Sequence, residues 1–594
     1  VNANVKGVLS MSNFANQGAI GNAIRMNPTL PVYDKSANGM NGYFIWRKGG
    51  DVNTMATRNP VALLMEKTDK SEANRMIGNV QLDYKIHGFE DLRINVNLGL
   101  DYASSKGYTE LPVGAGESYY DTKQNGSGYH GDYTYTRIDQ TFEAYAAYNK
   151  DINKHHVDAM LGYSWQQFFN ESCNYSYKLT DGAKLSEGNP AGELFLVSFF
   201  GRANYSYDNR YMITATIRRD GTSRFQNNKW GLFPSVALGW NIANEGFLKD
   251  NDVLTTFKLR ASWGQTGQQG VGGYYDTLPN YYKNQLGSYY YFGGKLIYPL
   301  TALGYNADLK WETTTTYNVG LDFGFLNDRI TMGVDGYIRK TTDLLNFIPV
   351  PALGNLTNYL NTNIGSLENR GIEFEMNAMA IDTNDWTWSI GGNIAFNRTT
   401  ITKLTASAND KTGVETGGIS GGVGNNIQMH QVGYAPSSFY VYQQAYDKNG
   451  KAIENCVVDR NGDGQITEGD RYFYKSPAAP VTMGFASRLE YKNWDLGFSL
   501  RASFDNYVFS NIESGNANLN KNEVWASTNF LSNRPVASLA DGWQTYSPTA
   551  LLSDRYVHNA SFLKCDNITL GYSFEGFGKD EKYKGLSGRL YATV

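Results

Sequence analysis

The feature that most constrains this fold is a period-two alternation of apolar and polar side chains along most of the chain. In residues 93–100 every second residue is apolar, and residues 213–217, 319–325 and 496–500 repeat the pattern. Successive side chains of a β-strand point to opposite faces, so each segment has one apolar face and one wet face. The alternation predicts many half-buried strands, although a soluble β-sandwich would show the same pattern.

The connections between the predicted strands separate a barrel from a sandwich. Short turns are expected at 87–88, 208–209, 327–328 and 492–493. Between these strand pairs lie long polar stretches, roughly at 104–132, 170–194, 266–311, 341–369, 397–479 and 504–554. Outer-membrane barrels alternate short periplasmic turns with long extracellular loops, whereas a sandwich or propeller spaces its loops more evenly. We therefore predict an all-β chain that forms a transmembrane antiparallel β-barrel, with about seventeen strands of spanning length and long extracellular loops.

Composition agrees with a barrel that is polar inside. Aromatic residues make up 14% of the chain, and 63 Gly stand against only 15 Pro, which favours strands and turns over helices. The longest nearly apolar stretch, 194–200, is far shorter than the roughly 20 residues of a spanning helix. A set of Tyr, Trp and Phe residues falls near the predicted strand ends, as interfacial girdles require: Tyr84, Tyr102, Tyr163, Trp165, Trp240, Trp263, Trp311 and Phe396.

Several classes of function find no support. The net charge is -4 and no basic run is present, so nucleic acid is not expected as a partner. The three Cys lie far apart without a CxxC pair, and the six His lack metalloenzyme spacing. No nucleophile signature occurs, and Glu373 with Glu375 lies on the wet face of a strand, as lumen lining would. We predict that the chain is not an enzyme.

One loop, 459–470, has the spacing of an EF-hand calcium loop. Gly464 occupies the position of the sharp turn, and the last position is Asp rather than Glu. The predicted ligands are oxygens of Asp459, Asn461, Asp463, Gln465 and Asp470. We expect one calcium ion with a structural role on the extracellular side, where the flanks 440–442 and 472–474 form strands. The alternative is an Asn/Asp/Gly turn that binds no metal.

A second cluster consists of tyrosines in the long loop 266–311. Its members are Tyr274, Tyr275, Tyr281, Tyr282, Tyr289, Tyr290 and Tyr291. Aromatic faces stack on sugar rings, and exposed aromatic clusters mark binding surfaces. Contact with substrate or with a partner protein is one interpretation, and packing against neighbouring loops is the other. The glycine-rich stretch 417–424 lacks the Lys-Ser/Thr of a phosphate-binding loop and is interpreted as plain loop.

Seven further segments, in order over about 370 residues, resemble the SusC/RagA family of TonB-dependent transporters. They are 199–205 with 218–225 and 233–240, 259–267, 311–322, 367–373, 459–464, 561–564 and 570–572. Residues 26–33 and 59–62 resemble the first long loop of that family. The resemblance covers nearly the whole chain.

The resemblance implies a place and a mode of action. It implies the outer membrane of a Gram-negative bacterium and active import of an oligosaccharide, possibly starch-derived, although some relatives carry peptides. A SusD-like surface lipoprotein would capture the cargo and close over the barrel, and TonB would act through an N-terminal region and a plug. Membrane lipid would surround the wall. A passive porin or adhesion barrel is the main alternative, and a secreted carbohydrate-active enzyme is a third.

The resemblance also sets an expectation about completeness. The family carries 22 strands, an N-terminal extension and a plug, so residues 1–594 would be an incomplete barrel domain that lacks the plug and about five strands. Since unpaired backbone groups in lipid cost several kcal/mol each, we expect that this chain does not close a barrel by itself.

Overall fold

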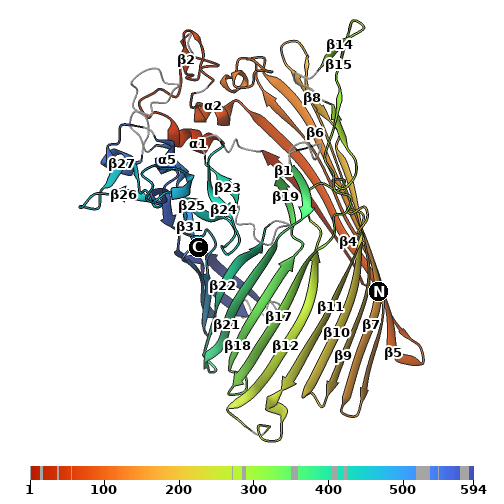
Figure 1. The fold of residues 1–594 in the computed structure, drawn as a ribbon. Coiled ribbons are helices and arrows are strands. Elements are labelled where there is room, and N and C mark those ends of the chain that lie inside the picture. The colour runs from red at the N-terminus through yellow and green to blue at the C-terminus, as the bar shows by residue number, and fades with distance from the viewer. Residues whose placement is uncertain are drawn as a thin grey trace.

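The structure is a computed structural model of the chain, and it has the architecture of a large curved β-sheet beneath a crown of loops (Figure 1). It describes residues 2–13, 18–36, 39–54, 56–249, 251–270, 272–283, 289–349, 357, 359–404, 413–419, 424–516, 535–545, 547–575 and 587–594. Within these ranges, no helix has the length and apolar character needed to cross a membrane.

One antiparallel sheet of 18 strands forms the wall. Its strands are β1 (Asn2–Asn13), β4 (Thr68–Ile86), β5 (Phe89–Leu111), β6 (Tyr129–Ile152), β7 (His155–Lys178), β8 (Lys184–Gly188), β9 (Ala191–Tyr207), β10 (Tyr211–Thr222), β11 (Trp230–Asn241), β12 (Leu254–Gln268), β17 (Glu312–Phe325), β18 (Ile330–Thr342), β21 (Ser366–Asp382), β22 (Trp386–Lys403), β29 (Val481–Tyr491), β30 (Trp494–Phe504), β33 (Phe562–Glu575) and β34 (Ser587–Thr593). Each strand pairs with its neighbours in chain order, and the short β8 is a side branch on β7. The prediction of about seventeen barrel strands is confirmed.

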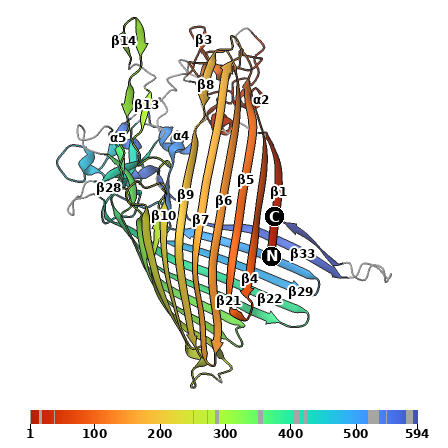
Figure 2. The same cartoon turned by 90° about the vertical axis from the view of Figure 1, so that its right-hand side faces the viewer.

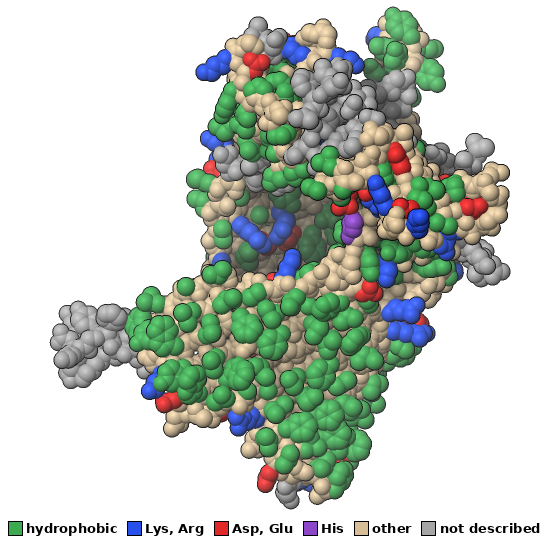
Figure 3. All heavy atoms as spheres, turned by 90° about the vertical axis from the view of Figure 1, so that its left-hand side faces the viewer, with side chains coloured by type: hydrophobic (Ala, Val, Ile, Leu, Met, Phe, Trp, Pro, Cys, Tyr) green, Lys and Arg blue, Asp and Glu red, His purple; other side chains and the backbone are tan. Residues whose placement is uncertain are grey.

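The two faces of the wall differ in character, as the alternation predicts. Figure 3 shows a broad apolar band on the outer wall, and above it a hollow that contains Lys and Arg side chains. On β5, Ile94 and Leu98 lie on the exposed outer face, while Asn95 between them is buried on the inner face and donates to Asp83 at 3.0 Å. The wall therefore presents apolar side chains to lipid and polar ones to the lumen.

Aromatic pairs gather near the short-turn end of the wall. Trp386 and Tyr491 pair across strands with ring centroids 4.2 Å apart, and Trp494 lies 4.8 Å from Tyr572. Phe257 stacks on Phe323 at 5.1 Å. Amphipathic and aromatic rings favour the boundary between hydrocarbon and water, so this row forms the lower girdle of the apolar band.

Four tight turns lie where the sequence predicts them. Residues 87–88, 208–209, 327–328 and 492–493 each connect two paired strands. Several of these residues have positive φ, including Asp208, Asn209 and Asn327 at 52°, 52° and 60°. Short polar side chains tolerate this left-handed region better than bulky ones, which explains the Asn/Asp pairs at the turns.

Two of the six predicted long loops prove to be partly strand. β5 continues to Leu111 and β6 begins at Tyr129, so much of 104–132 is paired. Likewise β7, β8 and β9 occupy most of 170–194. These strands are 17–24 residues long, apart from β8, and rise well above the rest of the wall (Figure 2). Above the lipid both faces of a sheet are wet, so the alternation that reveals strands elsewhere is lost there.

The sheet has two edges among the described residues. β1 pairs with β4 and β34 pairs with β33, and no ladder joins β1 to β34 within the part of the chain that the structure describes. Figure 1 shows the N-terminal and C-terminal ends of the chain apart from one another. The wall is thus a curved sheet with a lateral gap between these two strands.

The crown on the long-loop side contains short strands and helices. They are α1 (Gly18–Arg25), α2 (Pro60–Met65), α3 (Asn511–Gly515), α4 (Val536–Asp541), α5 (Pro548–Leu551), β2 (Arg47–Lys48), β3 (Asp51–Val52), β13 (Tyr281–Lys283), β14 (Tyr290–Phe292), β15 (Lys295–Ile297), β16 (Leu300–Ala302), β19 (Leu345–Pro349), β20 (Tyr359–Asn363), β23 (Val414–Gly418), β24 (Asn426–His430), β25 (Ser438–Val441), β26 (Gln444–Tyr446), β27 (Ala452–Val457), β28 (Tyr472–Phe473), β31 (Tyr507–Phe509) and β32 (Val557–Asn559). Together they form the outer rim.

Candidate functional site

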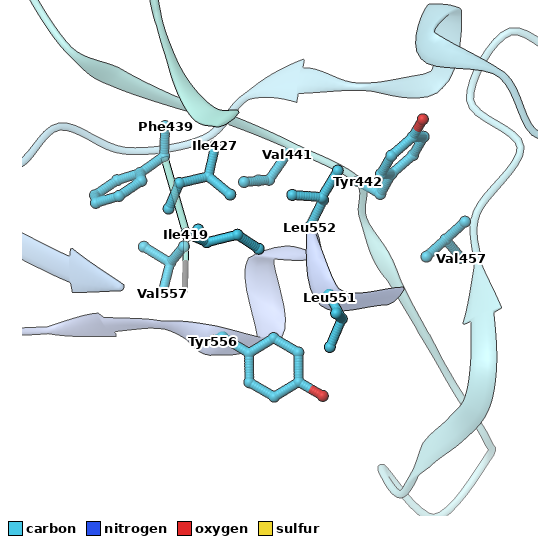
Figure 4. Packing of buried hydrophobic residues seen from close by; sticks show 10 residues of the cluster. All are labelled: Ile419, Ile427, Phe439, Val441, Tyr442, Val457, Leu551, Leu552, Tyr556 and Val557. Carbon is cyan, nitrogen blue, oxygen red and sulfur yellow. The ribbon is translucent and has the colours of Figure 1, made fainter. Parts of the chain in front are cut away.

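The outer rim contains a packed module with its own apolar core. Ten buried residues meet there, and they come from segments more than a hundred residues apart in sequence (Figure 4). They are Ile419, Ile427, Phe439, Val441, Tyr442, Val457, Leu551, Leu552, Tyr556 and Val557. Burying large apolar side chains stabilises a fold by roughly 1.5–3 kcal/mol each. The loops of 397–479 and 504–554 are therefore held together as one body, which we call the rim module.

Polar contacts fasten the rim module across the same segments. The Asp554 carboxylate accepts from the Gln444 backbone N–H at 2.9 Å and from the Tyr472 hydroxyl at 2.7 Å. Burial, and then this hydrogen bond, raises the pKa of Tyr472 above its ordinary value. Glu454 accepts from the backbone N–H groups of Gln544 and Thr545 at 2.7 and 2.6 Å, and contacts with Thr545 hold its pKa below the ordinary value.

The 459–470 loop is attached directly to this module. Arg471, which follows it, has a side chain only 4% exposed and pairs with Glu415 at 2.7 Å. Its guanidinium also donates to the carbonyls of Asn426 and Tyr440 at 2.6 and 2.8 Å. The predicted flanking strands exist as β25 and β28, which pair with each other. The loop therefore begins and ends on a fixed frame.

The first half of the loop folds around its own acidic side chains. The Asp459 carboxylate accepts from the N–H groups of Gly462 and Gly464 at 2.7 and 2.8 Å. Asn461 accepts from the N–H of Asp463 at 2.9 Å, and Asp463 accepts from that of Gln465 at 2.8 Å. Gly464 has φ of +81°, a conformation that disfavours a side chain, so glycine is required at this turn.

Asp470 closes the loop from the other end. One carboxylate oxygen accepts from the N–H groups of Arg460 and Asn461 at 2.8 and 3.2 Å, and the other accepts from Thr467 at 2.8 Å. The residue is 0% exposed. These bonds, that from Thr467 first, hold the pKa of Asp470 below its ordinary value despite burial. Asp470 is thus ionised and tied to the first turn of the loop.

The donor set fits a calcium ion through oxygen atoms of several kinds. Among the described residues no three His, Cys, Asp or Glu side chains form a metal-binding group. A site here would therefore need the Asn461 amide oxygen and the Gln465 carbonyl besides Asp459 and Asp463, a mixture typical of calcium loops. The Asp470 oxygen that accepts one bond keeps a free lone pair, whereas the other accepts two, so Asp470 suits a single contact with the ion.

The predicted tyrosine cluster does not come together as one surface. Tyr274 and Tyr275 lie against the wall: the Tyr274 hydroxyl accepts from Asn170 at 3.2 Å, and the Tyr275 hydroxyl accepts from the Glu193 N–H at 3.0 Å. The Arg224 guanidinium lies 5.2 Å from the Tyr274 ring centroid. For these two residues the packing interpretation of the sequence is the one that the structure supports.

The remaining tyrosines belong to two small hairpins. Tyr281 begins β13 and is exposed, and the side chain of Tyr282 lies outside the described side chains. Tyr289, Tyr290 and Tyr291 lie at and in the β14–β15 hairpin, which projects from the rim in Figures 1 and 2. Tyr291 is 74% exposed. This hairpin offers free aromatic faces on the outer side.

Ion-pair networks that no sequence pattern reveals line the lumen. Arg75 donates to both oxygens of Asp101 at 2.9 and 2.7 Å. Arg137 also contacts Asp101 and pairs with Asp139 at 3.1 Å. These side chains come from β4, β5 and β6 and point to the inner face. Along each strand they alternate with residues that point to the outer face.

Two more networks repeat this arrangement around the wall. Arg260 of β12 donates to Asp322 of β17 at 2.8 Å and to Asp335 of β18 at 2.9–3.0 Å. Asp495, with a side chain only 8% exposed, pairs with Arg589 of β34 at 2.5 Å and lies 3.8 Å from Arg488. Arg260 meets Asp335 across Gly320, and Arg589 meets Asp495 across Gly571, so in each pair the two residues lie two strands apart. Strand register is therefore needed to see these pairs.

These three lumen networks are consequently polar and nearly neutral. Across the three networks five guanidiniums face six carboxylates, because Glu490 also pairs with Arg488 at 2.9 Å. Paired charges still offer hydrogen-bond donors and acceptors to water or to a polar solute. Such a surface suits a polar cargo without a strong net charge.

The comparison that decides the family is a match over most of the chain. Residues 27–506 match the family described as TonB dependent receptor-like, beta-barrel. The chain belongs to this family. It is a TonB-dependent receptor barrel of SusC/RagA type and lies in the outer membrane of a Gram-negative bacterium. Its relatives are receptors rather than enzymes. The resemblance seen in the sequence is confirmed.

Two curated relatives and one solved structure are similar to the chain over nearly its whole length. The chain is 44% identical over 619 aligned positions to the TonB-dependent receptor SusC of Bacteroides thetaiotaomicron, covering 100% of this chain and 60% of that protein. A TonB-dependent receptor of Formosa agariphila is 30% identical, covering 97% and 57%. Among solved structures, the RagAB peptide importer in its closed-closed state has a TM-score of 0.77 at 22% identity, covering 100% of this chain and 66% of the other.

The chain spans about 60% of the length of the curated relatives that it matches. At 22% identity the RagAB likeness shows the fold alone.

Proposed function

We propose that this TonB-dependent receptor imports oligosaccharides actively across the outer membrane together with a SusD-like surface lipoprotein. The observation that carries the proposal is family membership over residues 27–506, combined with a polar lumen behind an apolar outer wall. A passive pore would need only the wall. In a receptor of this family TonB drives the opening of the barrel. The lumen can therefore remain closed until a cargo has bound.

Oligosaccharide is the cargo class that best fits the side chains. The three lumen networks are nearly neutral, and neutral sugars bind through hydrogen bonds and aromatic stacking rather than through a fixed charge. Identity to SusC is 44%, against 22% to the RagAB peptide importer. Both observations favour the glycan class implied by the SusC-type resemblance over peptides, whose termini and side chains carry charge.

The outer rim supplies the surface for a lipoprotein. Its exposed aromatic side chains Tyr281, Tyr290, Tyr291 and Phe292 are of the type enriched at protein interfaces. Loops 266–311 and 504–554 are the proposed contacts, and a lid seated on them would bury far more than the roughly 1,600 Å² of a standard interface. TonB would act from the periplasmic side.

Co-purification tests the partner. Tagged complete protein extracted from membranes in mild detergent should elute with a lipoprotein at near-equal stoichiometry. Replacing residues 290–297 of the projecting hairpin by a short glycine linker should lower that yield and leave the barrel folded. Replacing 47–52, another short hairpin of the rim, is the matched control. Elution of the tagged protein alone, while the lipoprotein is present in the same membranes, would refute the lid.

Uptake tests the cargo and the energy source. Cells with and without the gene should be given a fluorescent oligosaccharide or a fluorescent peptide of similar size. We expect gene-dependent accumulation of the oligosaccharide that ceases when TonB is removed. Gene-dependent entry that persists without TonB would support the passive porin, and preferential peptide uptake would overturn the glycan assignment.

We also propose that the 459–470 loop binds one calcium ion. The loop supplies oxygens of Asp459, Asn461 and Asp463 in a tight turn, together with the Gln465 carbonyl and one oxygen of Asp470. When bound, the ion would supply positive charge that fixes the loop to the rim module. The role is structural, since the loop is joined to β28 and Arg471 rather than to the lumen networks.

A further inference from the structure

A cationic cluster lies on the outer face of the wall, immediately above the apolar band. On three adjacent strands the last outward apolar residue is followed, two positions higher, by a cation. Ile338 is followed by Lys340 on β18, Ile372 by Arg370 on β21, and Phe396 by Arg398 on β22. Lys and Arg side chains gather along the upper margin of the green band in Figure 3. The cluster therefore lies at the level of the lipid headgroups.

Two of these cations oppose each other directly. Arg370 and Arg398 are cross-strand partners in the β21–β22 register, so their guanidiniums share one face of the sheet. Like charges directly opposite each other are destabilising in an antiparallel pair. Both residues are exposed to the outside rather than to the lumen.

The acidic residues near the cluster do not neutralise it. Glu368 pairs with Arg370 at 2.5 Å and with Lys340 at 3.7 Å. Arg398 has no ion pair or hydrogen bond with any residue that the structure describes. Three cations thus share one carboxylate, and the excess positive charge centres on the Arg370–Arg398 pair.

Beneath the two arginines the wall has a shallow, open groove of about 620 Å³. Its apolar side chains are Ile338, Ile372, Phe396 and Val481, and Arg370 with Arg398 forms its upper end. Gly336 forms part of the floor, and a Cβ atom added there would meet no atom within 4 Å. The groove is therefore open space on the lipid side of the sheet.

We propose that this groove binds a phosphate-bearing lipid of the outer leaflet, with the phosphate between Arg370 and Arg398 and an acyl chain along the groove. Guanidinium groups bind phosphate oxygens through paired charge-assisted hydrogen bonds, and two such groups side by side match a single phosphate. The apolar floor disfavours a soluble anion as the ligand, because such an anion would leave the apolar groove unfilled, whereas an acyl chain fills it. Charge and shape thus select the same occupant. The site lies outside the lumen and is independent of the cargo proposed above.

The test uses the complete protein, purified from outer membranes with its partners and stripped of lipid in detergent. Native mass spectrometry would follow titration with dioleoyl phosphatidic acid. Dioleoylglycerol has the same chains without the phosphate, and inorganic phosphate has the anion without the chains. We expect phosphatidic acid to bind at least roughly tenfold more tightly than either, since each half of the site contributes.

Three variants separate the two halves of the site. Arg370→Gln with Arg398→Gln should weaken phosphatidic acid binding by roughly tenfold or more, as loss of two charge-assisted contacts implies. Gly336→Leu fills the groove and should weaken phosphatidic acid binding but leave inorganic phosphate unchanged. Arg339→Gln is the matched control, because Arg339 neighbours Lys340 but faces the lumen beside Tyr337, and it should change nothing.

Each outcome decides the proposal. Equal phosphatidic acid affinity in the unmodified protein and the double variant would overturn it. So would dioleoylglycerol binding as tightly as phosphatidic acid, or inorganic phosphate competing as effectively as the lipid, since one half of the site would then contribute nothing. Heat-modified mobility in gels checks that the variants are folded. If the double variant is not folded, Arg398→Gln alone serves, because Arg398 has no ion pair or hydrogen bond to lose among the described residues.

Discussion

At the scale of single residues, the 459–470 loop shows how one carboxylate can organise a turn. Asp470 accepts three backbone hydrogen bonds from residues on both sides of the loop. Asp459, Asn461 and Asp463 of the first half accept from backbone amides of the same loop. The same oxygens that order the turn are those that a calcium ion would need, so order and ion binding depend on the same atoms.

Calcium binding is the first prediction at this scale. Isothermal titration of the complete protein should show one calcium ion bound per chain. The double variant Asp459→Asn with Asp463→Asn should lose that binding. Asp470→Asn removes the charge of a proposed ligand that also orders the loop, and should weaken calcium affinity by roughly ten- to a hundredfold. Glu468→Gln is the control: it removes one negative charge two residues before Asp470, and the Glu468 side chain has no loop contact among the described residues. This variant should bind calcium normally. Unchanged calcium stoichiometry in the Asp459/Asp463 double variant would contradict the site.

The second prediction concerns pH. The pKa of Asp470 is below its ordinary value in the folded loop, so the carboxylate stabilises the loop fully above the ordinary pKa of an aspartate. That contribution is lost as the pH falls through the lower folded value. Hydrogen exchange should therefore show the amides of Arg460 and Thr467 protected from neutral pH down to about pH 4, and losing protection in more acidic buffer. Loss of protection already near pH 6 would contradict the assignment.

At the scale of elements, the lumen networks connect neighbouring strands at the same height. Arg260 joins β12, β17 and β18 through two carboxylates, and its side chain is one-third exposed. Solvent reaches these charges, so each pair contributes less than a fully buried pair would. Their effect on strand pairing depends on balance: removing the cation leaves two carboxylates that repel each other.

The third prediction follows from that balance. Arg260→Met should destabilise the folded barrel by about 1–2 kcal/mol after allowance for solvent screening. Adding Asp322→Asn and Asp335→Asn in the same chain should recover most of that loss, because the unpaired carboxylates are removed with the cation. Heat-modified gel mobility against temperature would measure both effects. A triple variant less stable than Arg260→Met would show that the network stabilises by more than charge balance.

Much of the wall could be predicted from sequence because a strand in lipid leaves a strong signal. Residues 93–100 and 319–325 alternate since one face meets hydrocarbon and the other water, and both lie in wall strands. The upper parts of β5 to β7 were assigned to loops because both of their faces are wet. The ion pairs of the lumen depend on strand register. Arg75 and Asp101 are 26 residues apart, so sequence alone does not reveal their pairing.

The candidate sites also differ in whether they are local in sequence or built from distant strands. The 459–470 loop is local, and its ordering bonds join residues at most ten positions apart, so its spacing alone was informative. The tyrosines of 266–311 form no such unit, because Tyr274 and Tyr275 bind the wall through Asn170 and Glu193 from distant strands. The Arg370–Arg398 pair was likewise invisible, since the two residues meet only through the β21–β22 register.

At the scale of the whole molecule, the wall and the rim module have different sources of stability. The wall is held by backbone ladders, and its apolar side chains face outward to lipid. The rim module is held by a water-excluding core of the kind found in soluble domains. A detergent that replaces lipid should therefore affect the wall more than the rim, and a lipoprotein bound to the rim would meet a preformed surface.

The last prediction concerns closure of the wall. Among the described residues β1 pairs only with β4 and β34 pairs only with β33, which leaves two rows of backbone N–H and C=O groups facing the gap. Each such group costs several kcal/mol in hydrocarbon, so a sheet with two free edges is unstable in a bilayer. A protein made of residues 1–594 alone, refolded into lipid vesicles, should fail to give the compact heat-modifiable form. The complete gene product in the same vesicles is the control. If residues 1–594 instead insert and resist proteolysis, with β1 and β34 cross-linked through introduced cysteines, the two edges can pair directly and the gap is not a property of the folded wall.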